Sequence, residues 1–172
     1  MAKSNIVLVT VNPPPSVSIS PTSVVMDVGQ SKLFASTVSG GTSPFSYQWY
    51  LNDAPVSGAT SSSWLFTPSS PASYTVFVNV TDFVGVTAKS NIASVTVNPP
   101  PTVAISPALV TMDVGQSQLF TSAASGGTPP YSYQWYLVPN SVTGATLPSW
   151  TFTPTSPGIY YVYLNVTDSK GR

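Results

Sequence analysis

The sequence repeats itself with a period of 86 residues, and this repeat limits the folds open to the chain. Trp49 aligns with Trp135 (135 − 49 = 86), and Tyr74 aligns with Tyr160 without a gap between the two pairs. When the sequence is shifted by one period, 55 of the 85 residue pairs are identical. Because a repeated sequence folds as a repeated unit, the 172 residues predict two small domains of the same design.

Within each period, hydrophobic and polar residues alternate over short stretches that Gly, Pro and Ser residues separate. In "SYTVFVNVTD", residues 73–82, a tyrosine and three valines fall on one face, with Thr, Phe and Asn on the other. A period of two is typical of a half-buried β-strand, and no window shows the 3.6-residue period of a helix. We therefore predict an all-β fold with two tandem antiparallel β-sandwich domains.

The strand "SYQWYLN" (46–52), followed by "YTVFVNVTD" (74–82) and a final strand, resembles polycystic-kidney-disease (PKD) and related Ig-like domains. Such domains stand in tandem on archaeal and bacterial surface proteins, and the resemblance covers both periods. The loop after the tryptophan strand departs from the commonest PKD pattern, so the resemblance is to the broader Ig-like class. It implies a core tryptophan in the third strand and a tyrosine near the start of the penultimate strand: Trp49 and Trp135, Tyr74 and Tyr160.

The repeat also predicts where the domains begin and end. Residues 13–98 contain one complete Ig-like domain, and residues 99–172 contain a second that lacks its own final strand. That final strand has a copy in the N-terminal segment 1–12, because "AKSNIVLVTVN" (2–12) matches "AKSNIASVTVN" (88–98). The triple prolines at 13–15 and 99–101 restrict the backbone, and we expect them to act as stiff spacers.

We expect the N-terminal segment to complete the second domain of a neighbouring subunit. Fully extended, it spans roughly 36 Å, which argues against reaching past the first domain within one molecule unless the two domains fold back on each other. Insertion between molecules is strand addition at a sheet edge, resembling donor-strand complementation in pili, and it would build an open head-to-tail homopolymer. The predicted donor residues are Ile6, Val7, Leu8, Val9 and Val11, and the predicted acceptor strand carries Tyr160, Val162, Leu164 and Val166.

A change between the two copies of the strand favours this hypothesis. Ala93 and Ser94 of the internal copy are replaced by Val7 and Leu8, which offer more apolar area to a partner. Burying Val7 and the two further inward valines of the segment would contribute about 5–9 kcal/mol at about 1.5–3 kcal/mol each. The alternatives are a fragment of a longer tandem-repeat surface or adhesion protein, and an accessory module that binds polysaccharide.

Residue types exclude most enzymatic chemistry. The chain has no Cys, His or Glu, and its five acidic residues are all Asp. Asp27 and Asp113 lie in "MDVGQ" and Asp82 and Asp168 in "VTD" turns, where we expect the carboxylates to accept backbone hydrogen bonds rather than to hold a metal. We therefore predict a structural protein that is not an enzyme and needs no cofactor.

Charge and hydropathy bound the partners and the location. A net charge of zero does not favour binding to nucleic acid. The sequence contains no run of about 18 apolar residues, so it predicts no membrane insertion. A surface rich in Ser, Thr, Asn and Gln predicts an extracellular or cell-surface protein.

Two further surface features carry predictions. The sequons "NVT" at Asn79 and Asn165 place Asn side chains outward, as N-glycosylation requires. Outward aromatic residues on neighbouring strands could stack on the sugar rings of cell-surface glycans, or serve only as strand formers. This predicted aromatic strip consists of Tyr50, Phe77, Tyr136, Tyr161 and Tyr163.

Overall fold

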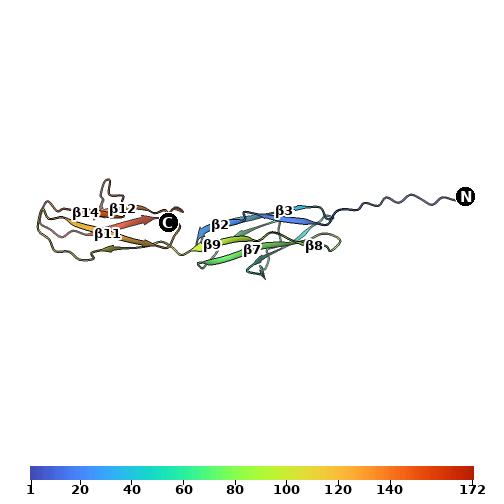
Figure 1. The fold of residues 1–172 in the computed structure, drawn as a ribbon, viewed down its shortest axis with the longest axis horizontal. Helices are drawn as coiled ribbons and strands as arrows, with labels where there is room; N and C mark the ends of the chain where they lie inside the picture. Colours follow the sequence, from blue (N-terminus) through green and yellow to red (C-terminus); the bar gives the residue numbers. More distant parts are fainter. The chain divides into compact units, whose positions relative to one another are not determined.

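The computed structural model describes residues 1–172 and contains β-strands but no α-helix, so the all-β prediction is confirmed (Figure 1). Accordingly, it contains no helix that could span a membrane. The chain divides into two compact units. The first consists of Met1–Val24, Ser31–Thr67 and Ser73–Thr96, and the second of Val25–Gln30, Pro68–Ala72 and Val97–Arg172.

The strands of the first domain form two sheets, and their strands pair mostly in antiparallel fashion, as expected of a β-sandwich. The smaller sheet has the order β1-β3-β6, and the larger has the order β2-β9-β7-β4-β5, with β8 paired to β7. In Figure 1, β2, β9 and β7 lie side by side. The strand bounds are β1 (Ser16–Ser20), β2 (Ser23–Asp27), β3 (Lys32–Ser39), β4 (Ser46–Leu51), β5 (Ala54–Pro55), β6 (Ser63–Phe66), β7 (Ala72–Thr81), β8 (Thr87–Lys89) and β9 (Ala93–Asn98).

The core of the first domain follows the alternation of the sequence. Trp49 on β4 pairs with Val78 on β7, and both side chains are fully buried. The indole N–H of Trp49 donates to the carbonyl of Ser61 at 2.9 Å, so the ring is buried without leaving its one polar atom unpaired. Phe34 on β3 closes the core from the opposite sheet.

The second domain repeats this design with fewer strands. One sheet has the order β10-β11-β14 and the other has the order β13-β12-β15. Trp135 is fully buried and donates to the carbonyl of Leu147 at 2.9 Å, as Trp49 does to its partner. The bounds are β10 (Thr102–Ser106), β11 (Gln118–Ser125), β12 (Ser132–Leu137), β13 (Asn140–Ser141), β14 (Ser149–Phe152) and β15 (Val162–Thr167).

Two stretches of the second domain lack the strands that their repeat partners form. Residues 109–113 correspond to β2 but form no strand, and β15 begins at the position equivalent to Val76, four residues after the start of β7. Residues 1–15 also form no strand (Figure 1). All strands from β1 to β9 lie within residues 13–98, and all from β10 to β15 lie within residues 99–172.

The buried face of β3 yields a test of this core. Phe34 is fully buried, whereas its neighbour Leu33 is 53% exposed. We expect Phe34→Ala to lower the free energy of unfolding of the first domain by about 3–5 kcal/mol, because it opens a cavity. Leu33→Ala is the matched control and should cost no more than about 0.5 kcal/mol.

The measurement is urea unfolding of the full chain followed by circular dichroism. Phe120→Ala, the repeat equivalent, assigns the two transitions because it should shift that of the second domain. Equal effects of the substitutions at positions 33 and 34 would show that the described alternation is wrong.

Candidate functional site

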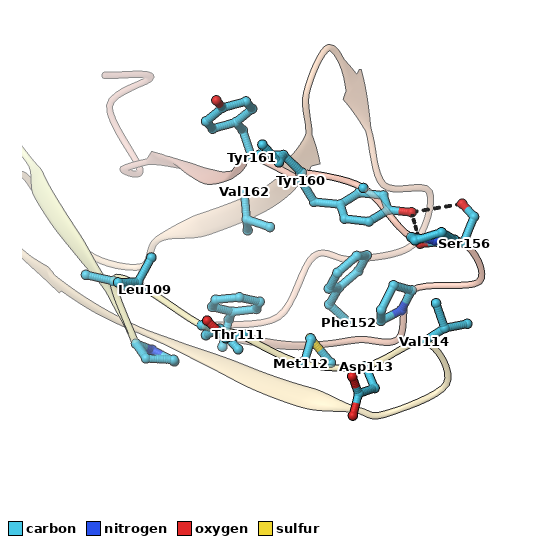
Figure 2. Close-up of a pocket in the computed structure, with 18 of the residues that line it drawn as sticks. Leu109, Thr111, Met112, Asp113, Val114, Phe152, Ser156, Tyr160, Tyr161 and Val162 are labelled. Carbon is cyan, nitrogen blue, oxygen red and sulfur yellow. Dashed lines mark hydrogen bonds between the residues drawn. The ribbon is translucent and has the colours of Figure 1, made fainter.

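The second domain contains a groove of about 690 Å³ between two segments that are not paired with each other. One wall comes from residues 107–114 and the other from residues 156–162, with Phe152 between them (Figure 2). Tyr160 and Val162 point into the groove, whereas the ring of Tyr161 points away from it. The site is therefore an elongated apolar slot along the edge of β15.

Several apolar side chains that line the groove are exposed to solvent. Leu109 is 88% exposed and Ile159 is 84% exposed. Met112 is only half-buried, although its repeat partner Met26 is 4% exposed.

In the first domain the equivalent space is filled by β9. This strand lies between β2 and β7, and its residues Ala93, Val95 and Val97 are at most 3% exposed. The corresponding walls in the second domain are residues 109–113 and β15. The groove thus lies at the position that β9 occupies in the first domain.

Side-chain and backbone hydrogen bonds fix the register of this strand in the first domain. Ile19 N–H donates to Asn91 Oδ1 at 2.8 Å, and Asn91 Nδ2 donates back to the Ile19 carbonyl at 3.3 Å. Ser94 N–H donates to the carbonyl of Thr22 at 3.0 Å. At the entry to the strand, Ser90 N–H donates to the Val78 carbonyl at 3.0 Å. Because the Asn91 amide pairs with both polar groups of one residue, a slipped strand would lose both bonds.

The tyrosine at the start of the predicted acceptor strand supports the far wall of the groove. Tyr160 Oη donates to the carbonyl of Ser156 at 2.8 Å, and its ring meets Phe152 edge-on at 5.1 Å between centroids (Figure 2). Of the other predicted acceptor residues, Val162 lines the groove, whereas Leu164 is buried in the core and Val166 packs against it.

The predicted donor residues are exposed and belong to no strand. Exposed fractions are 98% for Ile6, 91% for Leu8, and 72%, 75% and 86% for Val7, Val9 and Val11. The opposite wall, residues 107–114, was not foreseen. The signal for it was the match of "ALVTMD" (108–113) with "TSVVMD" (22–27), whose alternating Val24 and Met26 lie on β2.

The prediction of an exposed aromatic strip is wrong for Phe77. Its ring stacks on Tyr50 at 4.7 Å, Lys89 Nζ lies 3.8 Å from its centroid, and only 4% of the residue is exposed. The burial arises because β8 pairs with β7 and brings Lys89 over the ring. In the second domain Tyr136 and Tyr163 stack at 4.5 Å, and Tyr163 stays 40% exposed.

The two sequons differ in accessibility. Asn165 is exposed on β15, whereas Asn79 is half-buried and its Oδ1 is buried without a hydrogen-bond partner. Asn79 pairs with Lys89 across β7 and β8, which accounts for its cover. Of the two, Asn165 is the better placed for a bulky modification.

The "MDVGQ" turns use a different atom from the predicted one. The Gln30 Oε1 atom accepts the N–H of Asp27 at 2.8 Å, and Gln116 accepts that of Asp113 at 2.8 Å. The turn is closed by the amide three residues on, not by the carboxylate. No group of three or more His, Cys, Asp or Glu side chains lies together to hold a metal.

The aspartates of the "VTD" turns do accept backbone hydrogen bonds. Asp168 Oδ2 accepts from Thr128 N–H at 2.8 Å, and Oδ1 accepts from Lys170 and Arg172 N–H at 2.9 and 3.0 Å. Led by the Thr128 bond, these interactions lower the pKa of Asp168 to about 2, although its burial acts in the opposite direction. Gly127 permits this approach, because a Cβ there would lie 2.6 Å from Asp168 Oδ2.

Comparison with known proteins supports the architecture. No family model matches the chain. Over 109 residues, 58% of the chain, it is 29% identical to a highly immunogenic outer capsid protein of Enterobacteria phage T4. The chain spans 29% of the length of that relative.

Among solved structures, the three N-terminal domains of the bacteriophage RB49 highly immunogenic outer capsid protein (Hoc) match with a TM-score of 0.50 and 17% identity. The match covers 92% of this chain and 55% of that one. The chain is a tandem of Ig-like β-sandwich domains. Fibronectin(III)-like modules of Clostridium thermocellum CbhA match with a TM-score of 0.46 and 18% identity, covering 90% and 87%.

The Asp168 turn generates a prediction on acid stability. Because the folded-state pKa lies below the ordinary value of 3.8, ionised Asp168 stabilises the second domain fully above about pH 4. That contribution should disappear as the pH falls from about 4 to about 2. Asp168→Asn should lower stability at pH 7 and flatten this pH dependence, because the amide N–H₂ group cannot accept from backbone N–H groups.

Urea midpoints of the second domain, measured from pH 7 down to pH 2, provide the readout. The control is Asp53→Asn, since Asp53 is exposed in a turn. If Asp168→Asn reproduced the pH profile of the unaltered chain, the Asp168 turn would not be the source of the acid sensitivity.

Proposed function

We propose that this chain is a non-enzymatic structural module that stands on the outer surface of a virus particle or a cell. The observation that carries the proposal is the tandem of Ig-like domains, combined with its similarity to an outer capsid protein of phage T4. Tandem sandwiches without charged clefts are suited to spacing and display rather than to catalysis. The same comparison supports an extracellular or particle-surface location.

The chemistry of the residues supports a role without catalysis or cofactor. The chain has no nucleophilic thiol and no imidazole. Asp82 and Asp168 already accept hydrogen bonds from backbone N–H groups. Val86 N–H donates to Asp82 Oδ1 at 2.8 Å, and Arg172 N–H donates to Asp168 Oδ1 at 3.0 Å. The exposed surface is mainly Ser, Thr, Asn and apolar residues with a few scattered charges, which is suited to binding rather than to catalysis.

A filament of such modules is the first specific form of this role. The observation that favours it is the coexistence of an unpaired apolar segment, 2–12, and an open strand-sized groove in the same chain. A surface that binds a different surface of the next copy makes a heterologous contact, which extends into an open chain of subunits. The product would be a head-to-tail homopolymer.

Glycan binding is the second specific form. The observation that favours it is the Tyr136–Tyr163 stack, which leaves Tyr163 exposed beside Tyr161 at 67% exposure. Aromatic rings offer apolar faces to the C–H faces of sugars. The exposed Asn165 would carry a glycan itself if the chain passes through a secretory pathway that glycosylates proteins.

The surface role predicts that the chain is reachable from outside. Antibodies raised against the purified chain should label intact particles or cells that carry it, without any permeabilisation, when observed by immunogold electron microscopy. Labelling that appears only after the particles or cells are opened would contradict the proposal. Antibodies to an internal protein of the same preparation serve as the control for intactness.

Glycan binding predicts a loss of retention on polysaccharide columns when the exposed ring is removed. Tyr163→Ala should elute earlier than the unaltered chain, whereas Tyr163→Phe should be retained because the ring remains. Tyr50→Ala is the control in the first domain, where Lys89 covers the stacked partner. If all variants elute with the unaltered chain, the tyrosine stack does not bind polysaccharide.

A further inference from the structure

We propose that the groove of the second domain binds residues 2–12 of a second copy of the chain as an added β-strand. The incoming strand would lie between residues 109–113 and β15, in the position that β9 holds between β2 and β7 in the first domain. The inference rests on the proposed head-to-tail assembly and names the contact that produces it.

The first argument is that the chain already contains this interaction in a covalently connected form. Residues 2–12 match residues 88–98 at nine of eleven positions, differing only where Val7 and Leu8 replace Ala93 and Ser94. The groove that accepts β9 in the first domain is repeated in the second with the same Met, Phe and Val at its base. These pairs are Met26 and Met112, Phe66 and Phe152, Val76 and Val162.

The second argument is the fit of alternate side chains. In β9 the buried residues are Ala93, Val95 and Val97, which correspond to Val7, Val9 and Val11. The exposed Ile92, at 53%, corresponds to Ile6, and the exposed Ser94 corresponds to Leu8. In the docked strand the three valines therefore face the groove, and Ile6 and Leu8 face outward. The inward set is more apolar than in the covalent case.

The third argument is that the residues whose hydrogen bonds fix the register of β9 have counterparts both in residues 2–12 and in the second domain. Asn5 corresponds to Asn91 and Ile105 to Ile19, so the Asn5 amide would exchange two hydrogen bonds with the Ile105 backbone. Leu8 N–H would donate to the carbonyl of Ala108, as Ser94 does to Thr22. Ser4 N–H would donate to the carbonyl of Leu164, as Ser90 N–H does to that of Val78. The strand would dock in one register from Ser4 to Asn12.

The occupant is a second copy because the donor features are all present in this segment. Its inward positions 7, 9 and 11 are all valine, and its Asn5 matches Asn91, whose amide hydrogen-bonds to Ile19 in the first domain. Both the segment and the groove are exposed in the same molecule, so raising the concentration of the chain drives their association.

The first experiment compares two substitutions one residue apart in the full chain. Val9→Lys would place a charge in the apolar groove, whereas Leu8→Lys would place the same charge on the outside. We expect the unaltered chain and Leu8→Lys to form species well above the monomer mass of 18.0 kDa in sedimentation velocity, increasing with concentration. Val9→Lys should weaken association by at least about tenfold. Asn5→Ala should weaken it too, through loss of the register bonds.

The second experiment locates the contact with engineered thiols, which is clean because the chain has no cysteine. Ser94 lies beside the Thr22–Ser23 segment, so Leu8 of one copy should lie beside Leu109 of the other. Neighbouring strands are about 4.8 Å apart, within the range a disulfide can bridge. A chain with Leu8→Cys mixed with a chain carrying Leu109→Cys should give a cross-linked heterodimer. The matched control is Leu147→Cys, at a leucine 67% exposed that does not line the groove.

The outcomes separate this inference from the broader proposals. Oligomers that survive Val9→Lys, together with equal cross-linking at positions 109 and 147, would overturn strand docking but leave head-to-tail assembly standing. A concentration-independent monomer whose 162–166 amides are protected from hydrogen exchange would show that the groove is filled within one molecule, which overturns the second copy. A monomer with unprotected 162–166 amides would overturn both docking and filament. Surface labelling is independent of all three outcomes.

Discussion

The pairing of β9 with both of its neighbours is the interaction that holds one edge of the first domain together. It satisfies the backbone of two strands at once and brings three small side chains over the core. Where the strand is present, β2 forms and β7 extends over ten residues. Where it is not, the corresponding residues 109–113 form no strand and β15 is four residues shorter. Strand structure at an edge is thus a consequence of having a partner, since isolated pairs gain little.

The two sheets and the buried tryptophan of the second domain form although no strand equivalent to β9 is present there. Trp135 stays fully buried and keeps its indole hydrogen bond although the groove beside it is open. The core of the second domain therefore rests on the pairing of β12 with β15 and on the packing of Phe120 and Phe152. The larger part of the second sandwich thus forms without a strand equivalent to β9, as the proposed docking of a separate strand requires.

The sequence predicted the parts of the structure that depend on short-range alternation and on the repeat. The all-β fold and the burial of Trp49 and Trp135 follow from a period of two and from residue types that favour strands. The groove was predicted on the side of Tyr160 and Val162, because those residues lie on a visible strand pattern. Its other wall was missed because residues 107–114 show only weak hydrophobic alternation. Their role becomes visible only when they are aligned with β2 of the first domain.

The other misses arise from long side chains that cover or cap a neighbouring residue, which hydrophobic alternation does not reveal. Phe77 does point away from the core, yet β8 returns along β7 and lays the Lys89 chain over the ring. The turn at Asp27 is closed by Gln30, an acceptor that alternation does not reveal. In both cases a long side chain covers or caps a neighbour at a distance that local periodicity does not encode.

The identity between residues 2–12 and residues 88–98 has one more consequence, which concerns competition. If residues 2–12 dock as proposed, the same segment would also fit the first domain, where β9 already lies. Connectivity would protect that first site, since a strand tethered by a short linker acts at an effective concentration of about 1 mM. A free strand at a concentration of about 1 μM would therefore lose to β9 there. On this proposal covalent attachment, rather than a difference in the groove, keeps the first site closed to exchange.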